Sequence, residues 1–298
     1  KKEPKPIYLE NAKKHIDWLI ENSSKGYSGA CWGTGFKIVI SDTLIYDKSV
    51  PFSTNTPYVL EALYEYFQIT NDVAIFEVIK SIYDFYEKDL VVLQEDENIL
   101  ITSYGPFKDR IVTNAVSYTM FAYSIFYKLF DNKKYIAQKI EKMMNFVASV
   151  QREDGSWLYA PYDSSSFIDC FHSVFILKNI IKTSRNIGIE LKLRSEMVNS
   201  GYKYIKESFL DKNFGLFKRF SVSNKPSLTK FDLYDNAEML YLAKLTNDDE
   251  SSISLEKNIK THFYSNKNIY SLIDMFKMKK NKNTLRWAVM PYLLAKSL

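Results

Sequence analysis

Apolar residues recur at helical spacing along most of the chain, and asparagine punctuates the pattern. One amphipathic stretch ends and the next begins at four asparagines, Asn71, Asn132, Asn186 and Asn247, which are 61, 54 and 61 residues apart. Each interval holds two amphipathic stretches separated by a segment rich in aromatic residues and glycine. Self-similarity at such a period marks an array of units that cannot bury their apolar faces alone. The pattern therefore predicts repeated pairs of helices.

Ten helices in five pairs are expected. The first spans about Tyr8 to Asn22, and the second begins at Thr56-Pro57, where threonine suits the N-cap and proline the first helical position. The other helices are expected to begin after Asn71-Asp72 and near Thr113, Lys133, Ser165, Leu191, Phe231, Ser251 and Thr284.

The connections inside each pair are long, whereas most connections between pairs are a few residues. The long ones are residues 23–53, 91–111, 151–164, 211–230 and 265–283. Loops longer than about 12–15 residues are uncommon and usually functional. The sequence therefore predicts a single all-α domain over residues 1–298, an (α/α) toroid of about five to six hairpins with long loops on one face. The even helices form its inner ring, and their N-termini carry partial positive charge toward the active face.

Composition limits the class of partner. The net charge is +5, and the lysines are scattered among acidic residues without alternating with aromatics along one face, which argues against nucleic acid. The aromatic share is 15%, including 22 tyrosines. This content suits a wet, ligand-binding interior, although an AT-rich genome explains it equally well.

Cys31 and Cys170 are too few for a disulfide framework and indicate a reducing compartment. No stretch resembles a membrane span, so no stable membrane insertion is expected. We expect a cytoplasmic protein, with a removed leader left open because the chain begins without methionine.

The segment Gln151-Arg152-Glu153-Asp154-Gly155-Ser156-Trp157 matches the pattern QxxDGSW. With this motif the chain resembles the α/α-toroid families of terpene cyclases and of sugar-processing proteins. We expect a structural role, in which Gln151 and Asp154 cap helix ends, Gly155 permits the turn and Trp157 fills the space between hairpins. Terpene cyclisation is disfavoured, because the acidic run at residues 248–250 lacks the required spacing.

Asp169 and His172 are three residues apart at the start of the sixth predicted helix, so both project from one helical face. A carboxylate that orients an imidazole is a common way to make a general acid or base. Two other interpretations are open. Asp169 could cap the helix while His172 bonds a neighbouring loop, or both could join Cys170 in a fragment of a zinc site. No metal and no cofactor are predicted.

Several short motifs extend the resemblance: Ser53-Thr54-Asn55-Thr56-Pro57, Thr113-Asn114-Ala115, Phe231-Asp232-Leu233-Tyr234 and Leu285-Arg286-Trp287. With these the chain looks like a bacterial α/α-toroid family encoded in surface-polysaccharide gene clusters. That family is distantly similar to the C-terminal domain of glucuronyl C5-epimerases and to α/α-toroid polysaccharide lyases. At Tyr234 the family has a histidine. The resemblance implies an oligo- or polysaccharide, or its precursor, as the partner, within a larger polysaccharide-assembly protein or complex.

The catalytic candidates are His172, Asp169, Tyr104 and Asp232, and the substrate-binding candidates are Arg110, Asn114, Trp32, Arg219, Tyr234, Arg286 and Trp287. Tyr104 could be a phenolic acid or base and Arg110 a clamp for a carboxylate. For Tyr104, a packed turn residue is an equally open interpretation, and for Asp232 a helix cap is the alternative.

These candidates favour proton abstraction beside a uronate carboxylate, leading to epimerisation or β-elimination. Two other functions stay open. One is glycoside hydrolysis with Asp169 and Asp232 as the paired carboxylates, and the other is a glycan-binding or assembly module without catalysis.

Overall fold

Helices alternate with long connections throughout the part of the chain that the structure describes. The computed structural model describes residues 5–39, 45–108, 110–188, 192–223 and 225–298. The chain forms two compact units, Lys1–Phe146 and Val147–Leu298. A single domain over residues 1–298 therefore stays a prediction.

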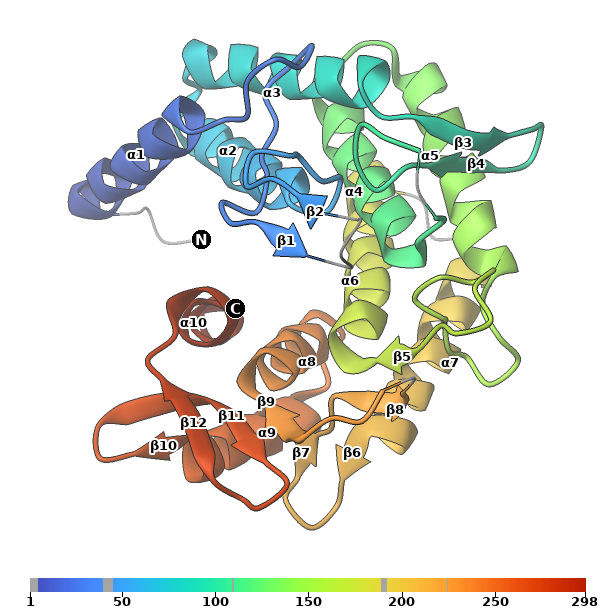
Figure 1. The fold of residues 1–298 in the computed structure, drawn as a ribbon. Helices are drawn as coiled ribbons and strands as arrows, with labels where there is room; N and C mark the ends of the chain where they lie inside the picture. Colours follow the sequence, from blue (N-terminus) through green and yellow to red (C-terminus); the bar gives the residue numbers. More distant parts are fainter. Residues whose placement is uncertain (1–4, 40–44, 109, 189–191, 224) are drawn as a thin grey trace. The chain divides into compact units, whose positions relative to one another are not determined.

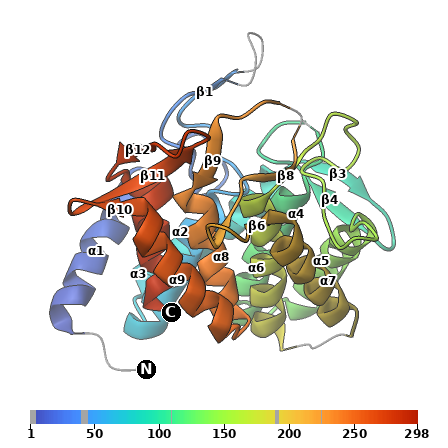
Figure 2. The ribbon, with the colours of Figure 1, turned by 90° about the horizontal axis from the view of Figure 1, so that it is seen from below.

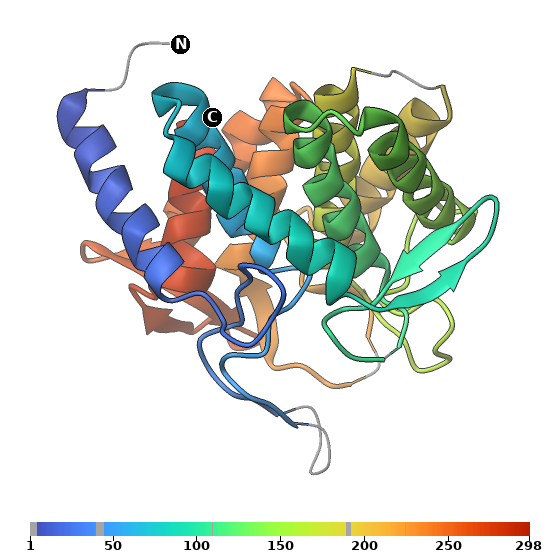
Figure 3. The ribbon, with the colours of Figure 1, turned by 90° about the horizontal axis from the view of Figure 1, so that it is seen from above.

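The first unit is built from two helical hairpins and a further helix that continues into the second unit (Figure 1). The helices are α1 (Pro6–Glu21), α2 (Thr56–Thr70), α3 (Val73–Lys88), α4 (Thr113–Leu129) and α5 (Lys133–Ser149). Two antiparallel β-hairpins lie in its long connections: β1 (Ile38–Val39) with β2 (Ile45–Tyr46), and β3 (Val92–Glu95) with β4 (Leu100–Thr102). The long connections of this unit leave the helices on one side (Figure 3).

The second unit contains α6 (Cys170–Ile187), α7 (Lys192–Phe209), α8 (Leu233–Leu245), α9 (Asp249–Phe263), the π-helical turn η1 (Leu285–Val289) and α10 (Met290–Ser297). Its short strands are β5 (Ile168–Asp169), β6 (Leu210–Asp211), β7 (Leu216–Phe217), β8 (Phe220–Val222), β9 (Thr229–Asp232), β10 (Tyr264–Ser265), β11 (Asn268–Asp274) and β12 (Lys279–Lys282). Strand β5 pairs with β8, β6 with β7, and β11 with β9, β10 and β12, all antiparallel.

Within each unit the even helices contact one another, as an inner ring requires, although α10 buries only Tyr292 and Ala295. Helix α2 contacts α4 in the first unit, and α8 contacts both α6 and α10 in the second. Every residue of α4 from Thr113 to Phe126 is buried, and α8 is buried over nearly its whole length. In Figure 2, α8 lies between α6 and α9. By contrast, α3 buries one stripe that includes Ile75, Ile79 and Ile82. Among the described residues, no helix combines the length and the apolar character needed to cross a membrane.

Two helix starts differ from the sequence prediction. The sixth helix begins at Cys170 rather than near Ser165, because the preceding serines form turns. Ser165 bonds the carboxylate of Asp163, and Ser166 accepts from the amide of Ala160. The second helix has Asn55 rather than Thr56 at its N-cap position, since the Thr56 hydroxyl accepts from the Trp32 amide. The expected start of the seventh helix, Leu191, lies outside the described residues.

The segment from Gln151 to Trp157 ties neighbouring helices together. The side-chain amide of Gln151 donates to the carbonyls of Gly155 and Met197 and to the Ser200 hydroxyl, which joins this turn to α7. Gly155 has φ +87°, a conformation that favours glycine. Trp157 is buried, and its indole NH donates to the carbonyl of Val147 at the end of α5. Its ring also lies against Gly201 of α7. These contacts give the motif a packing role.

Trp157→Ala should lower the free energy of unfolding by about 3–5 kcal/mol, because it removes a buried ring and leaves a cavity between α5 and α7. Chemical denaturation followed by circular dichroism measures this loss. Trp18→Ala is the matched control, since Trp18 is 60% exposed and its loss should change stability by about 0.5 kcal/mol or less. Equal stability losses in the two variants would contradict the packing role.

Candidate functional site

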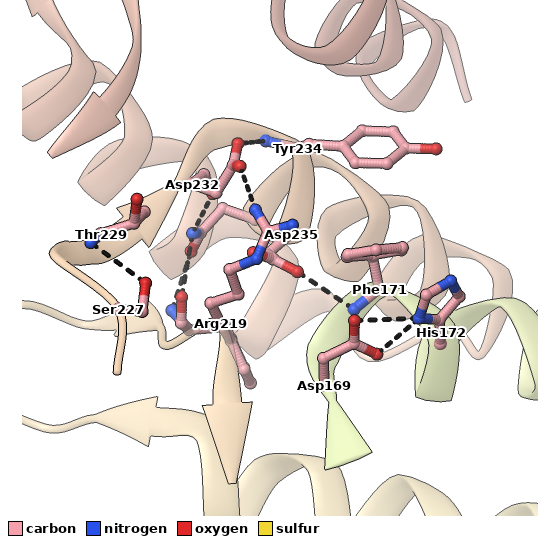
Figure 4. A network of polar contacts seen from close by, with 11 residues as sticks. Asp169, Phe171, His172, Arg219, Ser227, Thr229, Asp232, Tyr234 and Asp235 are labelled. Atoms are coloured by element: carbon pink, nitrogen blue, oxygen red, sulfur yellow. Dashed lines mark hydrogen bonds and ion pairs between the residues drawn. The ribbon is translucent and has the colours of Figure 1, made fainter. Parts of the chain in front are cut away.

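Asp169 and His172 form a hydrogen-bonded dyad at the junction of β5 and α6. Asp169 ends β5 and occupies the N-cap position of α6, but its side chain makes no capping bond. Instead, its two carboxylate oxygens lie 2.8 and 2.9 Å from Nδ1 of His172 (Figure 4). The capping interpretation of Asp169 is therefore wrong, and the side chain orients the imidazole.

The dyad determines which imidazole nitrogen is basic. Asp169 accepts the hydrogen bond, so the neutral imidazole carries its proton on Nδ1 and its lone pair on Nε2. Within the described residues, no hydrogen bond to Nε2 of His172 is found, and the side chain is 18% exposed. His172 can therefore accept a proton at Nε2 while Asp169 stabilises the resulting imidazolium.

Aromatic rings surround the imidazole. The ring centroid of His172 lies 4.0 Å from that of Phe171 and 4.7 Å from that of Tyr159. The rings of Phe167 and Phe175 are 6.2 and 6.0 Å away. Tyr234 extends the wall, because its ring is 5.5 Å from that of Phe171.

Arg219 and Asp232 form a second polar pair beside the dyad. Asp232 ends β9 and caps α8, with its carboxylate accepting from the amide of Tyr234 at 2.9 Å. Its other oxygen accepts from Nη1 of Arg219 at 2.8 Å. The guanidinium also lies over the ring of Phe171, 5.4 Å from its centroid. Phe171 therefore lies between the guanidinium of Arg219 and the imidazole of His172 (Figure 4). The capping interpretation of Asp232 is confirmed.

Asp235 lies between the two pairs and is fully buried. Its Oδ1 accepts from the backbone NH of Phe171 at 3.1 Å, and its Oδ2 has no partner among the described residues. Burial, together with the charge of Asp232, raises the pKa of Asp235 well above its usual value. Burial also raises the pKa of Asp232, although the Tyr234 amide and Arg219 oppose the rise. The raised pKa favours the protonated form of Asp235, and its hydrogen bond to the Phe171 amide holds the start of α6 against α8.

A row of acidic residues runs along one face of α8, three residues apart. After Asp232 and Asp235 comes Glu238, which forms a buried ion pair with Lys178 of α6 at 2.5 Å. The ammonium group of Lys178 also lies 4.1 Å from the ring centroid of Tyr241. This pair joins α6 to α8 further from the N-terminus of α6 than the dyad.

Cys170 is the third side chain of the zinc interpretation. It is fully buried, and burial raises the pKa of its thiol well above the usual value, with neighbouring carboxylates adding to the rise. Among the described residues, no three His, Cys, Asp or Glu side chains gather as metal ligands.

Arg286 and Trp287, in η1, are exposed, and the guanidinium lies 5.1 Å from the indole ring centroid. Arg286 interacts electrostatically with Tyr234. The second unit therefore brings Asp169, His172, Arg219, Asp232 and Tyr234 together, with Arg286 close to the outer tyrosine.

The remaining candidates lie in the first unit. The hydroxyl of Tyr104 accepts from that of Thr54 at 3.3 Å, Arg110 is exposed, and Asn114 is buried. Trp32 is also buried, and its indole NH donates to the carbonyl of Leu19, which favours a packing role over a sugar platform. That Tyr104 and Arg110 share a ligand with His172 stays a prediction.

Solved structures with similar folds come from proteins of carbohydrate chemistry. A sugar epimerase from a ruminal bacterium has a TM-score of 0.70 at 16% identity, over 98% of this chain and 80% of that one. A polysaccharide lyase has a TM-score of 0.66 at 11% identity, over 98% and 83%. An α-1,6-mannanase of Salegentibacter sp. HEL1_6, in complex with α-1,6-mannotetrose, has a TM-score of 0.63 at 9% identity, over 88% and 74%.

In sequence comparisons, no protein-family model and no curated protein matches the chain. The structural likeness establishes the fold. The chain is an all-α (α/α) toroid, as the sequence predicts.

The difference in free energy of unfolding between Asp235→Asn and the wild type should grow in favour of the variant as pH rises from about 5 to 8. The raised pKa means that folded Asp235 keeps a proton which the unfolded chain releases above about pH 4, so the wild type loses stability with rising pH. Asparagine retains the acceptor for the Phe171 amide and removes this loss. Urea unfolding at both pH values measures this difference in stability. Asp131→Asn is the control, because Asp131 is exposed. A difference that does not grow between the two pH values would mean that Asp235 is ionised in the folded protein.

Proposed function

We propose that the protein is a carbohydrate-active enzyme that abstracts a proton from a sugar carbon beside a uronate carboxylate, with His172 as the base. The observation that carries this proposal is the Asp169–His172 dyad, which leaves Nε2 available among aromatic rings. Abstraction moves the C–H proton to Nε2, and the electron pair of the broken bond passes to the carboxylate. Asp169 stabilises the imidazolium that forms.

A sugar suits the surroundings of the dyad. An aromatic face such as that of Tyr234 packs well against the apolar face of a sugar ring, and the tyrosine hydroxyl can bond a sugar hydroxyl. The solved structures with this fold include a sugar epimerase and a polysaccharide lyase, which is consistent with such a ligand.

The cationic groups favour a uronate. Proton abstraction places a second negative charge on the carboxylate, and preorganised donors stabilise that charge. Arg219 uses Nη1 for Asp232 and has further NH groups that can bind the carboxylate. Arg286 interacts electrostatically with Tyr234 and is a second candidate. Reprotonation on the opposite face gives the epimer, whereas departure of the substituent on the next carbon gives β-elimination.

Glycoside hydrolysis by Asp169 and Asp232 fits the geometry less well. Both oxygens of Asp169 lie within hydrogen-bond distance of His172, while those of Asp232 bond the Tyr234 amide and Arg219. A hydrolase needs one carboxyl group free to protonate the leaving oxygen and another free to act as nucleophile or base.

We further propose that the substrate is a surface polysaccharide or its precursor and that the protein acts in the cytoplasm as part of a larger polysaccharide-assembly system. This rests on the resemblance of the short sequence motifs, with Phe231–Tyr234 at the proposed site among them.

His172→Ala and Asp169→Asn test the proposed chemistry on a panel of uronate polymers. His172→Ala should lower the rate by about 10²–10⁴-fold without loss of folding, because it removes the base. Asp169→Asn should also lower the rate, since an amide can favour the wrong tautomer. Deuterium incorporation from D₂O detects epimerisation, and new ultraviolet absorbance detects elimination.

His262→Ala is the matched control, because His262 packs on Phe214 away from the dyad, and it should retain the wild-type rate. Full activity of the His172→Ala variant would contradict the assignment. Binding of glycans by the wild-type protein without any turnover would support the non-catalytic alternative instead.

A further inference from the structure

Three buried polar atoms of the first unit have no hydrogen-bond partner among the described residues: Oγ of Ser53, Nδ2 of Asn55 and Oδ1 of Asn114. Among the described residues of this unit, no other buried side-chain nitrogen or oxygen lacks a hydrogen-bond partner. Ser53 is fully buried and Asn114 is 2% exposed. An unpaired buried polar atom costs free energy, so three in one unit require an explanation. We call Ser53, Asn55 and Asn114 the amide cluster.

The three residues lie at one end of the α2–α4 pair. The hydroxyls of Tyr58 on α2 and Tyr118 on α4 are 2.5 Å apart, which fixes the facing sides of these helices. Asn55 stands three residues before Tyr58 and has helical backbone angles, and Asn114 stands four residues before Tyr118. Residues at these spacings share a helical face. Both amides therefore lie one turn closer to the helix N-termini than the tyrosine pair.

The connection that leads to α4 lies beside the amide cluster. The amide of Ser53 donates to the carbonyl of Tyr104 at 2.8 Å, and the hydroxyl of Thr54 donates to that of Tyr104 at 3.3 Å. The Tyr104 ring packs on Phe52, with centroids 5.2 Å apart. The cluster thus lies at the N-terminal ends of α2 and α4, next to the rings of Phe52 and Tyr104.

We propose that the amide cluster binds hydroxyl groups of a neutral sugar. The cluster offers a hydroxyl, an NH donor and a carbonyl acceptor, and a sugar hydroxyl both donates and accepts. None of the three side chains is charged, so they compensate the desolvation of an anionic ligand less well than a cationic side chain would. An ionised carboxylate or phosphate also has no proton to donate to Oδ1 of Asn114. This proposal does not depend on the reaction proposed for His172.

Asn114→Leu separates ligand binding from packing. Leucine has nearly the shape of asparagine and removes an unpaired acceptor, so the variant should unfold at the same temperature as the wild type or higher. The same change should weaken the binding of a neutral sugar about tenfold, because it removes a hydrogen bond to the ligand. Ser53→Ala should act in the same direction. A residue with only a packing role would not show loss of binding together with unchanged or raised stability.

The probes are α-1,6-mannotetraose and cellobiose as neutral saccharides and trigalacturonate as the charged one, measured by isothermal titration calorimetry with thermal unfolding alongside. Asn145→Leu is the matched control, because the Asn145 amide already donates to the carbonyl of Asn98, and it should leave affinity unchanged. The expected result is binding of a neutral probe by the wild type that both cluster variants weaken.

Three results would overturn the proposal. They are no binding of either neutral probe, a preference for trigalacturonate that the cluster variants weaken, or unchanged affinity of Asn114→Leu for a neutral probe. Binding is measured without turnover, so the outcome does not depend on whether His172 is a base.

Discussion

The inner helices α4 and α8 are buried over most of their length, and this burial decides where polar chemistry can occur. A charged group inside must find a partner within the protein, as Glu238 of α8 does with Lys178 of α6. The N-terminal ends, where the long connections arrive, are the parts of α6 and α8 that can combine polar groups with access to a ligand. The dyad and the Arg219–Asp232 pair both lie at such ends.

The short strands hold these helix ends in a defined geometry. Strand β5 pairs with β8, so that Asp169 is held against Phe220 at the end of a strand rather than in a free loop. Asp235 then holds the Phe171 amide from the neighbouring helix. Together these bonds set the start of α6 and leave the carboxylate of Asp169 to orient His172. A buried carboxyl group with a raised pKa suits this task, because its protonated form accepts a hydrogen bond without adding another charge beside Asp232.

The helices and the dyad could be predicted from sequence because they depend on local spacing. Apolar periodicity and caps located α4 and α5 at Thr113 and Lys133, and the three-residue spacing linked Asp169 to His172. The strands could not be predicted, since β5 finds its partner about fifty residues later and is only two residues long. The roles of Asp235 and of the Tyr159 ring also depend on such distant contacts. For the same reason, the periodicity could not predict that Nδ2 of Asn55 has no hydrogen-bond partner among the described residues.

Asp169 holds Nδ1 of His172 and leaves Nε2 as the basic nitrogen. Nitrogen-15 NMR of the histidine side chains tests this directly, because the shifts of Nδ1 and Nε2 differ between the two neutral tautomers. When the imidazole of His172 is neutral, we expect a proton on Nδ1 in the wild type and a shift of that tautomeric equilibrium in Asp169→Asn. A proton on Nε2 in the wild-type protein would show that Asp169 does not set the tautomer.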